Sequence, residues 1–179
     1  MIHRRIFLGA LGAGLFGHVQ ARPDDSDTLA IGAASLLVSE QDGGAAVSSS
    51  GLIDLTLVAY EFGRHAAPGP RVSTNVVAGA LSAAGADKEL LAGLLDGSAI
   101  GTWCISEGAP HAGVSEMAFD ISVQGQQLLL NGVKRPVESA HEASHFLVTG
   151  RTGDGLTQLL VPAATRGITL QPMRGGDLT

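Results

Sequence analysis

Hydrophobic residues recur at helical spacing through the first half of the chain. In the stretch GLIDLTLVAYEFGR, which begins at Gly51, apolar positions fall three and four residues apart, at Leu52, Leu55, Val58, Ala59 and Phe62. This spacing predicts a helix with one apolar face, because 3.6 residues make one helical turn. Gly63 and the run Pro68-Gly69-Pro70 are expected to end it.

Two further helices are predicted in this half. The stretch STNVVAGALSAA is a helical run from Thr74 to about Ala84, with Ser73 or Thr74 as its N-cap. DKELLAGLLDG, from Asp87 to Gly97, has an acidic start and a glycine end and predicts a third, short helix. Residues 28–98 are therefore expected to form a helical segment.

From Ala99 onward the pattern changes to short β-type runs. The runs are separated by explicit turn sequences at Gln124-Gly125-Gln126, Asn131-Gly132 and Gly153-Asp154-Gly155. Asn-Gly between β-type segments is a strong hairpin signal, so Asn131-Gly132 is expected at a turn or bulge. The predicted fold class is α+β, with the N-terminal helical segment followed by an antiparallel β-barrel-like domain over residues 99–179.

The N-terminus has the parts of an export signal of the twin-arginine type. Arg4-Arg5 precedes an apolar run from Ile6 to Gly17, and Val19-Gln20-Ala21 follows as a possible cleavage region. The run is too short to span a bilayer. Residues 1–27 are interpreted as such a leader or as the remnant of a helix whose start is missing, so the protein is expected in the cytoplasm or, alternatively, exported.

Composition narrows the classes of function. The chain has 179 residues, 45% hydrophobic and 16% charged, which is apolar enough for a folded core. A net charge of −6 argues against a nucleic-acid partner, since phosphate binding needs clustered Lys and Arg. The single cysteine, Cys104, excludes an internal disulfide framework.

One motif has the spacing of a zinc site. His141-Glu142-Ala143-Ser144-His145 reads His-Glu-x-x-His, and on a helix the two histidines would share a face. A catalytic zinc also needs a third protein ligand, yet after His145 the sequence has no Glu or His, and Asp154 and Asp177 lie in glycine-rich turns. We therefore predict no stoichiometric zinc and interpret this segment as a polar turn between two strands.

In order and spacing, a series of segments resembles the acyl-CoA dehydrogenase family from about Leu29 to Thr179. LLVSEQDGG is similar to a family stretch ending in Glu-x-x-Gly-Gly, and LVAYEFGRHAAPGP to a helix end of the type EELGR followed by PGP. TWCISE lies where the family carries a strand and loop ending in Thr-Glu-Pro. The segments LLLNGVKR, SHFLVTGRT and LLVPAATRGITLQPM match the hairpin and strands that follow.

The resemblance implies a fold and a reaction. The family has an N-terminal helical domain, a middle β-domain and a C-terminal four-helix domain, and this chain would hold the end of the first and most of the second. The family reaction, in fatty acid or lipid metabolism, is an FAD-dependent α,β-dehydrogenation of an acyl-CoA with a separate electron-transfer partner. A glutamate base takes the α proton, and the resemblance places that base in the C-terminal domain, so no catalytic residue is assigned here. An oligomer is expected.

The resemblance implies that two segments of this chain contact the flavin. The first is Trp103, Cys104, Ile105 and Ser106, where Ser106 stands for the family's flavin-contacting threonine and keeps its hydroxyl. The second is Pro136, Val137 and Glu138, where the family has Trp-Ile-Thr. The alternatives are that Ser106 caps its own turn, that Trp103 only packs, and that Cys104 is a small core residue.

Two departures from the family pattern weaken the expected cofactor site. Pro136 replaces a tryptophan that packs on the flavin, and Glu138 replaces a hydrogen-bond donor with a group that only accepts when ionised. A family serine that contacts phosphate or substrate is replaced near Ala112, with His111 beside it as a compensating donor or a solvated loop residue. FAD binding is therefore expected to be weak or lost.

Three functions remain open on the sequence. The chain is an acyl-CoA dehydrogenase-like flavoenzyme that is incomplete, a non-catalytic partner subunit of a hetero-oligomeric dehydrogenase, or an inactive fragment. Pro136, Glu138 and the altered loop at Ala112 favour the partner subunit.

Overall fold

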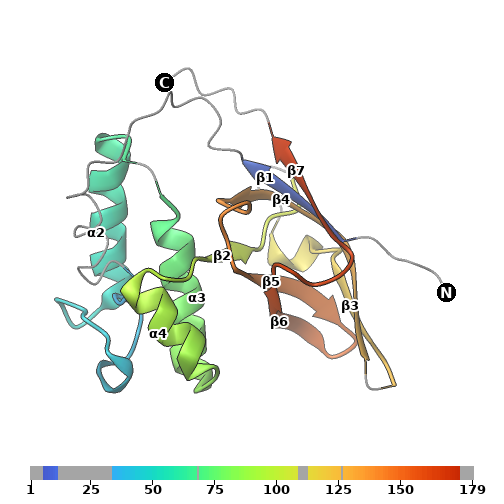
Figure 1. Ribbon diagram of the computed structural model, residues 1–179, viewed down its shortest axis with the longest axis horizontal. Coiled ribbons are helices and arrows are strands. Elements are labelled where there is room, and N and C mark those ends of the chain that lie inside the picture. The colour runs from blue at the N-terminus through green and yellow to red at the C-terminus, as the bar shows by residue number, and fades with distance from the viewer. Residues whose placement is uncertain (1–5, 12–33, 68, 109–112, 126, 174–179) are drawn as a thin grey trace. The chain divides into compact units, whose positions relative to one another are not determined.

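The computed structural model describes residues 6–11, 34–67, 69–108, 113–125 and 127–173, and for residues 6–11 it describes the backbone. The chain divides into two compact units, which are treated separately. One unit lies within Gly14–Gly101 and is helical, and the other joins the N-terminal strand to Thr102 and the residues that follow (Figure 1). Within the described residues, no helix has the length and apolar character that crossing a membrane requires.

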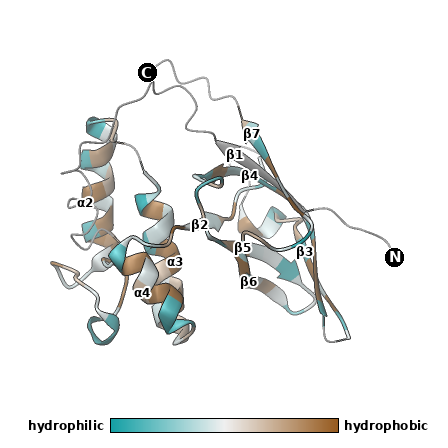
Figure 2. Ribbon diagram, viewed as in Figure 1, coloured by the Kyte–Doolittle hydropathy of each residue, from teal (hydrophilic) through white to brown (hydrophobic). Residues whose placement is uncertain are grey.

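The helical unit contains a short 3-10 turn, η1 (Glu40–Asp42), and the helices α2 (Gly51–Arg64), α3 (Arg71–Ala84) and α4 (Lys88–Asp96). Hydrophobic and hydrophilic positions alternate around the helices (Figure 2). The apolar positions of the three helices supply much of the unit's core, which includes Leu55, Val77, Ala78, Leu81, Leu90, Leu91 and Leu94. The three helices predicted from the hydrophobic spacing are therefore confirmed.

Helix α3 begins earlier than predicted. Its N-cap is Pro70 and its first residue is Arg71, so neither Ser73 nor Thr74 caps it. Proline suits this position because the N–H of an N-cap residue takes no part in the hydrogen bonds of the helix. Thr74 lies inside the first turn and donates its hydroxyl to the carbonyl of Gly101 at 3.0 Å.

Helix α4 follows the prediction closely. The carboxylate of Asp87 accepts a hydrogen bond from the backbone N–H of Leu90 at 3.0 Å, which makes Asp87 the N-cap. Gly97 ends the helix in the left-handed conformation, with φ of 81°.

The second unit is built on β1 (Ile6–Leu11), β2 (Gly101–Cys104), β3 (Asp120–Gln124), β4 (Gln127–Glu138), β5 (His145–Thr152), β6 (Gly155–Pro162) and β7 (Ile168–Met173), with a 3-10 turn η2 (Val114–Glu116). The strand order is β2-β5-β3-β4-β1-β7, and β6 pairs with β5. The buried residues include Phe119, Ile121, Val137, Phe146, Val148 and Val161.

The α+β class is confirmed, and the sheet is mixed rather than antiparallel. Pairs β3–β4 and β5–β6 are antiparallel, but β3 runs parallel to β5, and β1 runs parallel to both β4 and β7. The sheet is not closed into a barrel. Pairing departs from chain order because β5 lies beside β3, and β1 lies between two later strands.

Two of the three expected turns are confirmed. Gln124 pairs with Gln127, and Thr152 pairs with Gly155, so tight hairpins close at both glycine-containing turns. The expectation for Asn131-Gly132 is wrong, because both residues lie inside the 12-residue strand β4. Asn131 is the last residue of β4 that pairs with β3, and Gly132 is the first that pairs with β1.

Gly132 is required at this change of partner. Its φ is +155°, and a Cβ atom there would lie 2.6 Å from Cδ2 of Phe119. The glycine therefore allows the β4 backbone to pass directly over a buried aromatic ring.

Candidate functional site

The two segments predicted to contact flavin lie next to each other. The hydroxyl of Thr102 donates to the carbonyl of Glu138 at 2.7 Å, and the N–H of Arg135 donates to the carbonyl of Ser106 at 2.8 Å. These bonds hold the end of β2 and the residues after it against the end of β4. Segments roughly 30 positions apart in the sequence thus form one surface.

The side chains of this surface divide into two groups. Cys104 and Val137 are completely buried, so their side chains belong to the core and only their backbone groups are available to a ligand. Burial raises the pKa of the Cys104 thiol to about 12, which keeps it protonated and unreactive. Ser106, Pro136 and Glu138 are exposed and face solvent.

Trp103 and Ile105 are half-buried. The indole Nε1 of Trp103 donates to the hydroxyl of Thr149 on β5 at 3.0 Å, and Thr149 also accepts from Nε2 of Gln158 on β6 at 3.3 Å. This hydrogen-bonded chain fixes the orientation of the indole ring. Trp103 is therefore a half-buried packing residue whose ring is also held by a hydrogen bond. The sequence did not predict this hydrogen bond.

A buried ion pair lies directly beneath this surface. Nζ of Lys134 donates to Oε1 of Glu107 at 2.8 Å and to the carbonyl of Ile105 at 3.1 Å. The Lys134 side chain has 0% exposure and Glu107 has 20%. The ammonium group also lies 5.0 Å from the centre of the Phe119 ring.

The carboxylate of Glu107 is fully engaged. Besides Lys134, it accepts hydrogen bonds from the backbone N–H groups of Ala118 at 2.7 Å and Phe119 at 2.9 Å. Burial alone would raise the pKa of Glu107, but these three donors more than offset it and hold the pKa below its usual range. Burial also lowers the pKa of Lys134, and the neighbouring Glu107 opposes that shift. Glu107 is therefore an ionised structural anchor and a poor proton acceptor.

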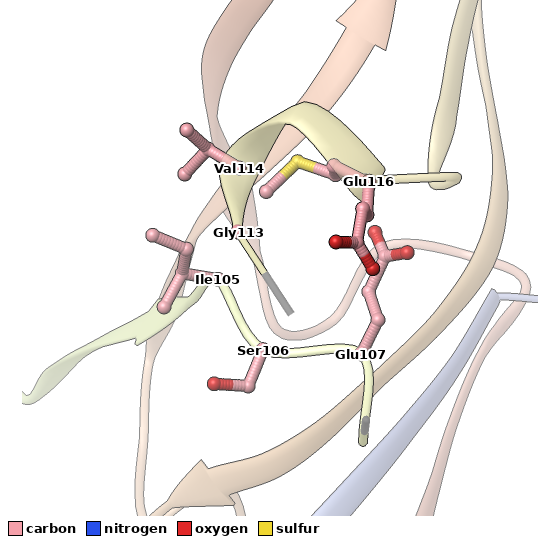
Figure 3. Close-up of a pocket in the computed structure, with 7 residues that line it drawn as sticks. Ile105, Ser106, Glu107, Gly113, Val114 and Glu116 are labelled. Atoms are coloured by element: carbon pink, nitrogen blue, oxygen red, sulfur yellow. The ribbon is translucent and has the colours of Figure 1, made fainter. Parts of the chain in front are cut away.

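A cavity of about 160 Å³ opens beside this ion pair. It is lined by residues that follow β2 and by residues of the η2 turn: Ile105, Ser106, Glu107, Gly113, Val114, Glu116 and Met117. In the view of Figure 3, the carboxyl groups of Glu107 and Glu116 lie on one side of the cavity, and Ile105 and Val114 lie on the other. The cavity thus has one acidic and one apolar wall.

Arg151 holds the η2 wall of the cavity in place. Its guanidinium donates to the carbonyls of Val114, Ser115 and Met117 at 3.1–3.2 Å. The sequence predicted neither the role of Arg151 nor the Lys134–Glu107 ion pair. The spacing of these residues along the chain does not indicate that they are in contact. Ala112, predicted to contact substrate, and His111 lie outside the described residues.

The His-Glu-x-x-His segment is a turn between β4 and β5, as predicted, and contains no helix. His141 and Glu142 are exposed, and Nδ1 of His145 lies 3.1 Å from the hydroxyl of Ser144. Within the described part of the chain, no group of three His, Cys, Asp or Glu side chains is arranged to hold a metal ion. The absence of zinc itself stays a prediction.

Comparison with solved structures gives several extensive matches. A variant of the Tcur3481-Tcur3483 steroid ACAD is 32% identical in sequence, with a TM-score of 0.66, over 79% of this chain and 39% of that one. The Tcur3481-Tcur3483 steroid ACAD itself matches at 22% identity and a TM-score of 0.62, over 80% of this chain and 39% of that one. The ChsE4-ChsE5 complex from Mycobacterium tuberculosis matches at 23% identity and a TM-score of 0.61, over 78% of this chain and 38% of that one.

The two solved structures that are less than 25% identical to this chain show only that it has a similar fold. This chain spans about two fifths of the length of the solved structures that it matches. No family model and no curated protein sequence matches it.

Proposed function

Because this chain resembles the acyl-CoA dehydrogenases in both fold and sequence, we propose that it supplies the flavin-side surface of an FAD-dependent acyl-CoA dehydrogenase. The observation that carries the proposal is the 32% identity to a steroid ACAD over 79% of this chain, at a TM-score of 0.66. In the proposed assembly this chain binds and orients the flavin ring. A different polypeptide segment contributes the base that accepts the proton.

We infer that the residues of this surface would lie along one edge of a bound flavin ring. Ser106 is exposed and keeps a hydroxyl that can donate a hydrogen bond, and the ring of Trp103 is held at the same segment by Thr149. When bound, FAD would accept the hydride from the acyl group. Ser106, Trp103 and the backbone from Cys104 to Ser106 would orient the ring, while the buried Lys134–Glu107 pair keeps their loop in one conformation.

A base is expected from outside the described residues. The dehydrogenation needs a group within hydrogen-bond reach of the α proton and able to accept it. Glu107 is held by three donors, and its lowered pKa makes it a weak acceptor of protons. Glu116, Glu138 and Glu142 are exposed, so none of them lies in the kind of dry pocket that would make a carboxylate an effective general base. We therefore propose that this polypeptide alone does not dehydrogenate acyl-CoA.

Flavin binding tests the surface directly. We expect the purified chain to retain FAD weakly or not at all through gel filtration. The double variant Pro136→Trp with Glu138→Thr restores an aromatic contact and a donor, so it is expected to bind FAD at least about tenfold more tightly, which corresponds to about 1.4 kcal/mol. Val133→Thr, at an exposed position of the same strand, is the matched control.

Three outcomes would contradict this account of the surface. Near-stoichiometric FAD on the unmodified chain would show that Pro136 and Glu138 do not weaken the site. No gain from the double variant, or an equal gain from Val133→Thr, would show that the flavin contacts are assigned to the wrong residues.

The second candidate is a non-catalytic partner subunit, and two observations favour it. The 32% identical steroid ACAD is named for two components, Tcur3481 and Tcur3483. The exposed Pro136 and Glu138 also suit a chain that leaves most cofactor binding to a partner. We propose that the partner is a complete dehydrogenase-like chain.

An activity assay separates the candidates. Monodisperse chain with excess FAD, an acyl-CoA and an artificial electron acceptor is expected to give no turnover above background. Co-expression with a complete dehydrogenase-like chain encoded nearby is expected to give a stable complex and turnover. Turnover by this chain alone would overturn the missing-base argument, and absence of any complex would remove the partner-subunit proposal.

A further inference from the structure

The helical unit contains a second cavity, separate from the proposed flavin surface. Its volume is about 130 Å³, and it lies between the start of α3, the end of α4 and the residues that follow α4. Leu94, Ala99 and Ile100 give it largely apolar walls, and Arg71 brings the only cationic side chain among its described lining residues.

Arg71 is half-buried, and the buried part of its guanidinium has no hydrogen-bond partner. Its Nε atom is buried and has no hydrogen-bond partner, and none of the three ion pairs among the described residues includes Arg71. Its Cζ lies 4.1 Å from the centre of the Phe62 ring, a contact that offsets part of the desolvation. Partial burial of the side chain lowers the pKa of Arg71.

Other arginines of the chain show the ordinary arrangement. Arg64 pairs with Glu61 at 3.4 Å, and Arg151 donates to three backbone carbonyls. A buried donor without an acceptor is destabilising, and more so when the donor is charged. Arg71 is the first residue of the 14-residue helix α3, at the positive end of the helix dipole. The first turn of this helix contains no acidic residue and no side-chain cap that would offset the positive charge.

We propose that this cavity binds a carboxylate carried on a short aliphatic chain, with the carboxylate on the guanidinium of Arg71 and the chain against Leu94 and Ala99. The apolar walls suit the hydrocarbon part, and a single negative charge is what one guanidinium neutralises. A phosphate or sulfate dianion would leave a net negative charge in an apolar cavity. The volume suits a molecule of about the size of butyrate. This inference does not depend on the proposed function, because every residue that carries it belongs to the helical unit.

The Nε–H of Arg71 provides a direct test in the whole chain. In nitrogen-15-labelled protein, titration with butyrate is expected to shift the Arg71 Nε–H resonance and slow its exchange with water. Butanol has the hydrocarbon part without the charge, and sulfate has charge without the hydrocarbon part. Each is expected to bind at least about tenfold more weakly than butyrate.

Variants assign the effect to the cavity. Arg71→Met removes the charge and Arg71→Lys removes the planar donor fork, so both are expected to weaken butyrate binding at least about tenfold. Arg64→Met, at an exposed arginine of the same unit, is the matched control and is expected to bind as the unmodified chain does. Ala99→Leu fills the cavity from another wall and is expected to abolish binding.

Stability in the absence of ligand gives an independent check. Arg71→Met removes an unpaired charge, so the free variant is expected to unfold at the same temperature as the unmodified chain or a higher one. Butyrate is expected to raise the unfolding temperature of the unmodified chain and not of the variant. An unchanged Arg71 resonance with butyrate, equal binding of butanol, or unaltered affinity in Arg71→Met would overturn the proposal.

Discussion

Lys134 is a charged side chain at 0% exposure, placed where a β-strand would ordinarily present an apolar residue to the core. It is stabilised by the Glu107 carboxylate, the Ile105 carbonyl and the Phe119 ring together. A buried pair of this kind gives little net stability compared with well-packed apolar residues, but removing one partner is strongly destabilising. Its role here is to fix the loop after β2.

Lys134→Met is therefore expected to destabilise the protein. The variant leaves Glu107 with two backbone donors and no counter-ion, and because Glu107 retains 20% exposure we expect a loss of about 2–4 kcal/mol, below the range for fully buried pairs. Chemical denaturation monitored by circular dichroism measures the free energy of unfolding. Lys88→Met, at the exposed lysine of α4, is the control and is expected to change that free energy by less than about 0.5 kcal/mol.

The same pair predicts a dependence of stability on pH. The pKa of Glu107 is lowered on folding from its ordinary value of 4.5, so the unfolded chain binds the proton more readily. The stability that Glu107 contributes is complete above about pH 4.5 and is lost as the pH falls through the lowered pKa. Glu107→Gln is expected to flatten the acid side of the stability profile, and an unaltered profile would contradict this account of the pair.

At the residue scale, the neighbouring residues in the sequence can indicate whether a side chain is buried, but they do not indicate which distant residues it contacts. The apolar flanks of Cys104 correctly indicate a small core residue, which its complete burial confirms. The Lys134–Glu107 bond and the Trp103–Thr149 bond join positions 27 and 46 apart. Neither spacing corresponds to a helix turn or a hairpin, so the sequence alone contains no signal for either bond.

At the scale of elements, β4 shows how a glycine can serve a strand rather than a turn. Asn-Gly favours a two-residue hairpin in isolation, but here the 12-residue strand continues through both residues because β1 replaces β3 as the pairing partner. Tertiary pairing therefore overrides the local turn preference. The three helices were predictable because each has an apolar stripe, whereas the start of α3 is displaced by Pro70, a residue that the sequence pattern assigns to the preceding breaker.

Gly132→Ala is expected to destabilise the sheet unit. The new Cβ would meet the Phe119 ring at 2.6 Å, and a φ of +155° is strained for any residue with a side chain. We expect a loss of about 1–3 kcal/mol in the free energy of unfolding. Gly153→Ala is the matched control, since nothing lies within 4 Å of its added Cβ. Equal effects of the two substitutions would show that the contact with Phe119 is relieved without cost.

The turn between β4 and β5 predicts the absence of a bound zinc ion. A helical His-Glu-x-x-His would place both imidazoles on one face, but the turn does not impose that spacing, and the sequence supplies no Glu or His downstream. Elemental analysis of protein purified without chelator is expected to find less than one zinc per chain. One tightly held zinc that is lost in His141→Ala would contradict the prediction.

At the scale of the whole molecule, the helical unit has several exposed apolar side chains on one helix. Helix α2 exposes Leu52, Ile53, Leu57 and Tyr60 at 58–65%. Exposed apolar residues gathered on one helix usually mark an interface or an aggregation-prone surface. Neither the composition nor the hydrophobic periodicity of the sequence indicates a partner for this helix.

We expect the isolated chain to self-associate through α2. Sedimentation at increasing concentration is expected to show species larger than a monomer, and the double variant Leu57→Gln with Tyr60→Gln is expected to shift the distribution toward the monomer. Val123→Gln with Leu128→Gln, exposed apolar residues of the β3–β4 hairpin, is the control. A monomer at every concentration, or an equal shift in the control, would contradict this expectation.

The hydrogen bond that holds Trp103 has a practical consequence. Trp103 is the sole tryptophan of the chain, and its indole is held at 3.0 Å by Thr149 beside the proposed flavin surface. The chain therefore carries a single indole fluorophore in a defined orientation, with an emission band that overlaps flavin absorption. Quenching of that emission, followed against added FAD, would report occupancy of the surface without any label, and Trp103→Phe would supply the blank.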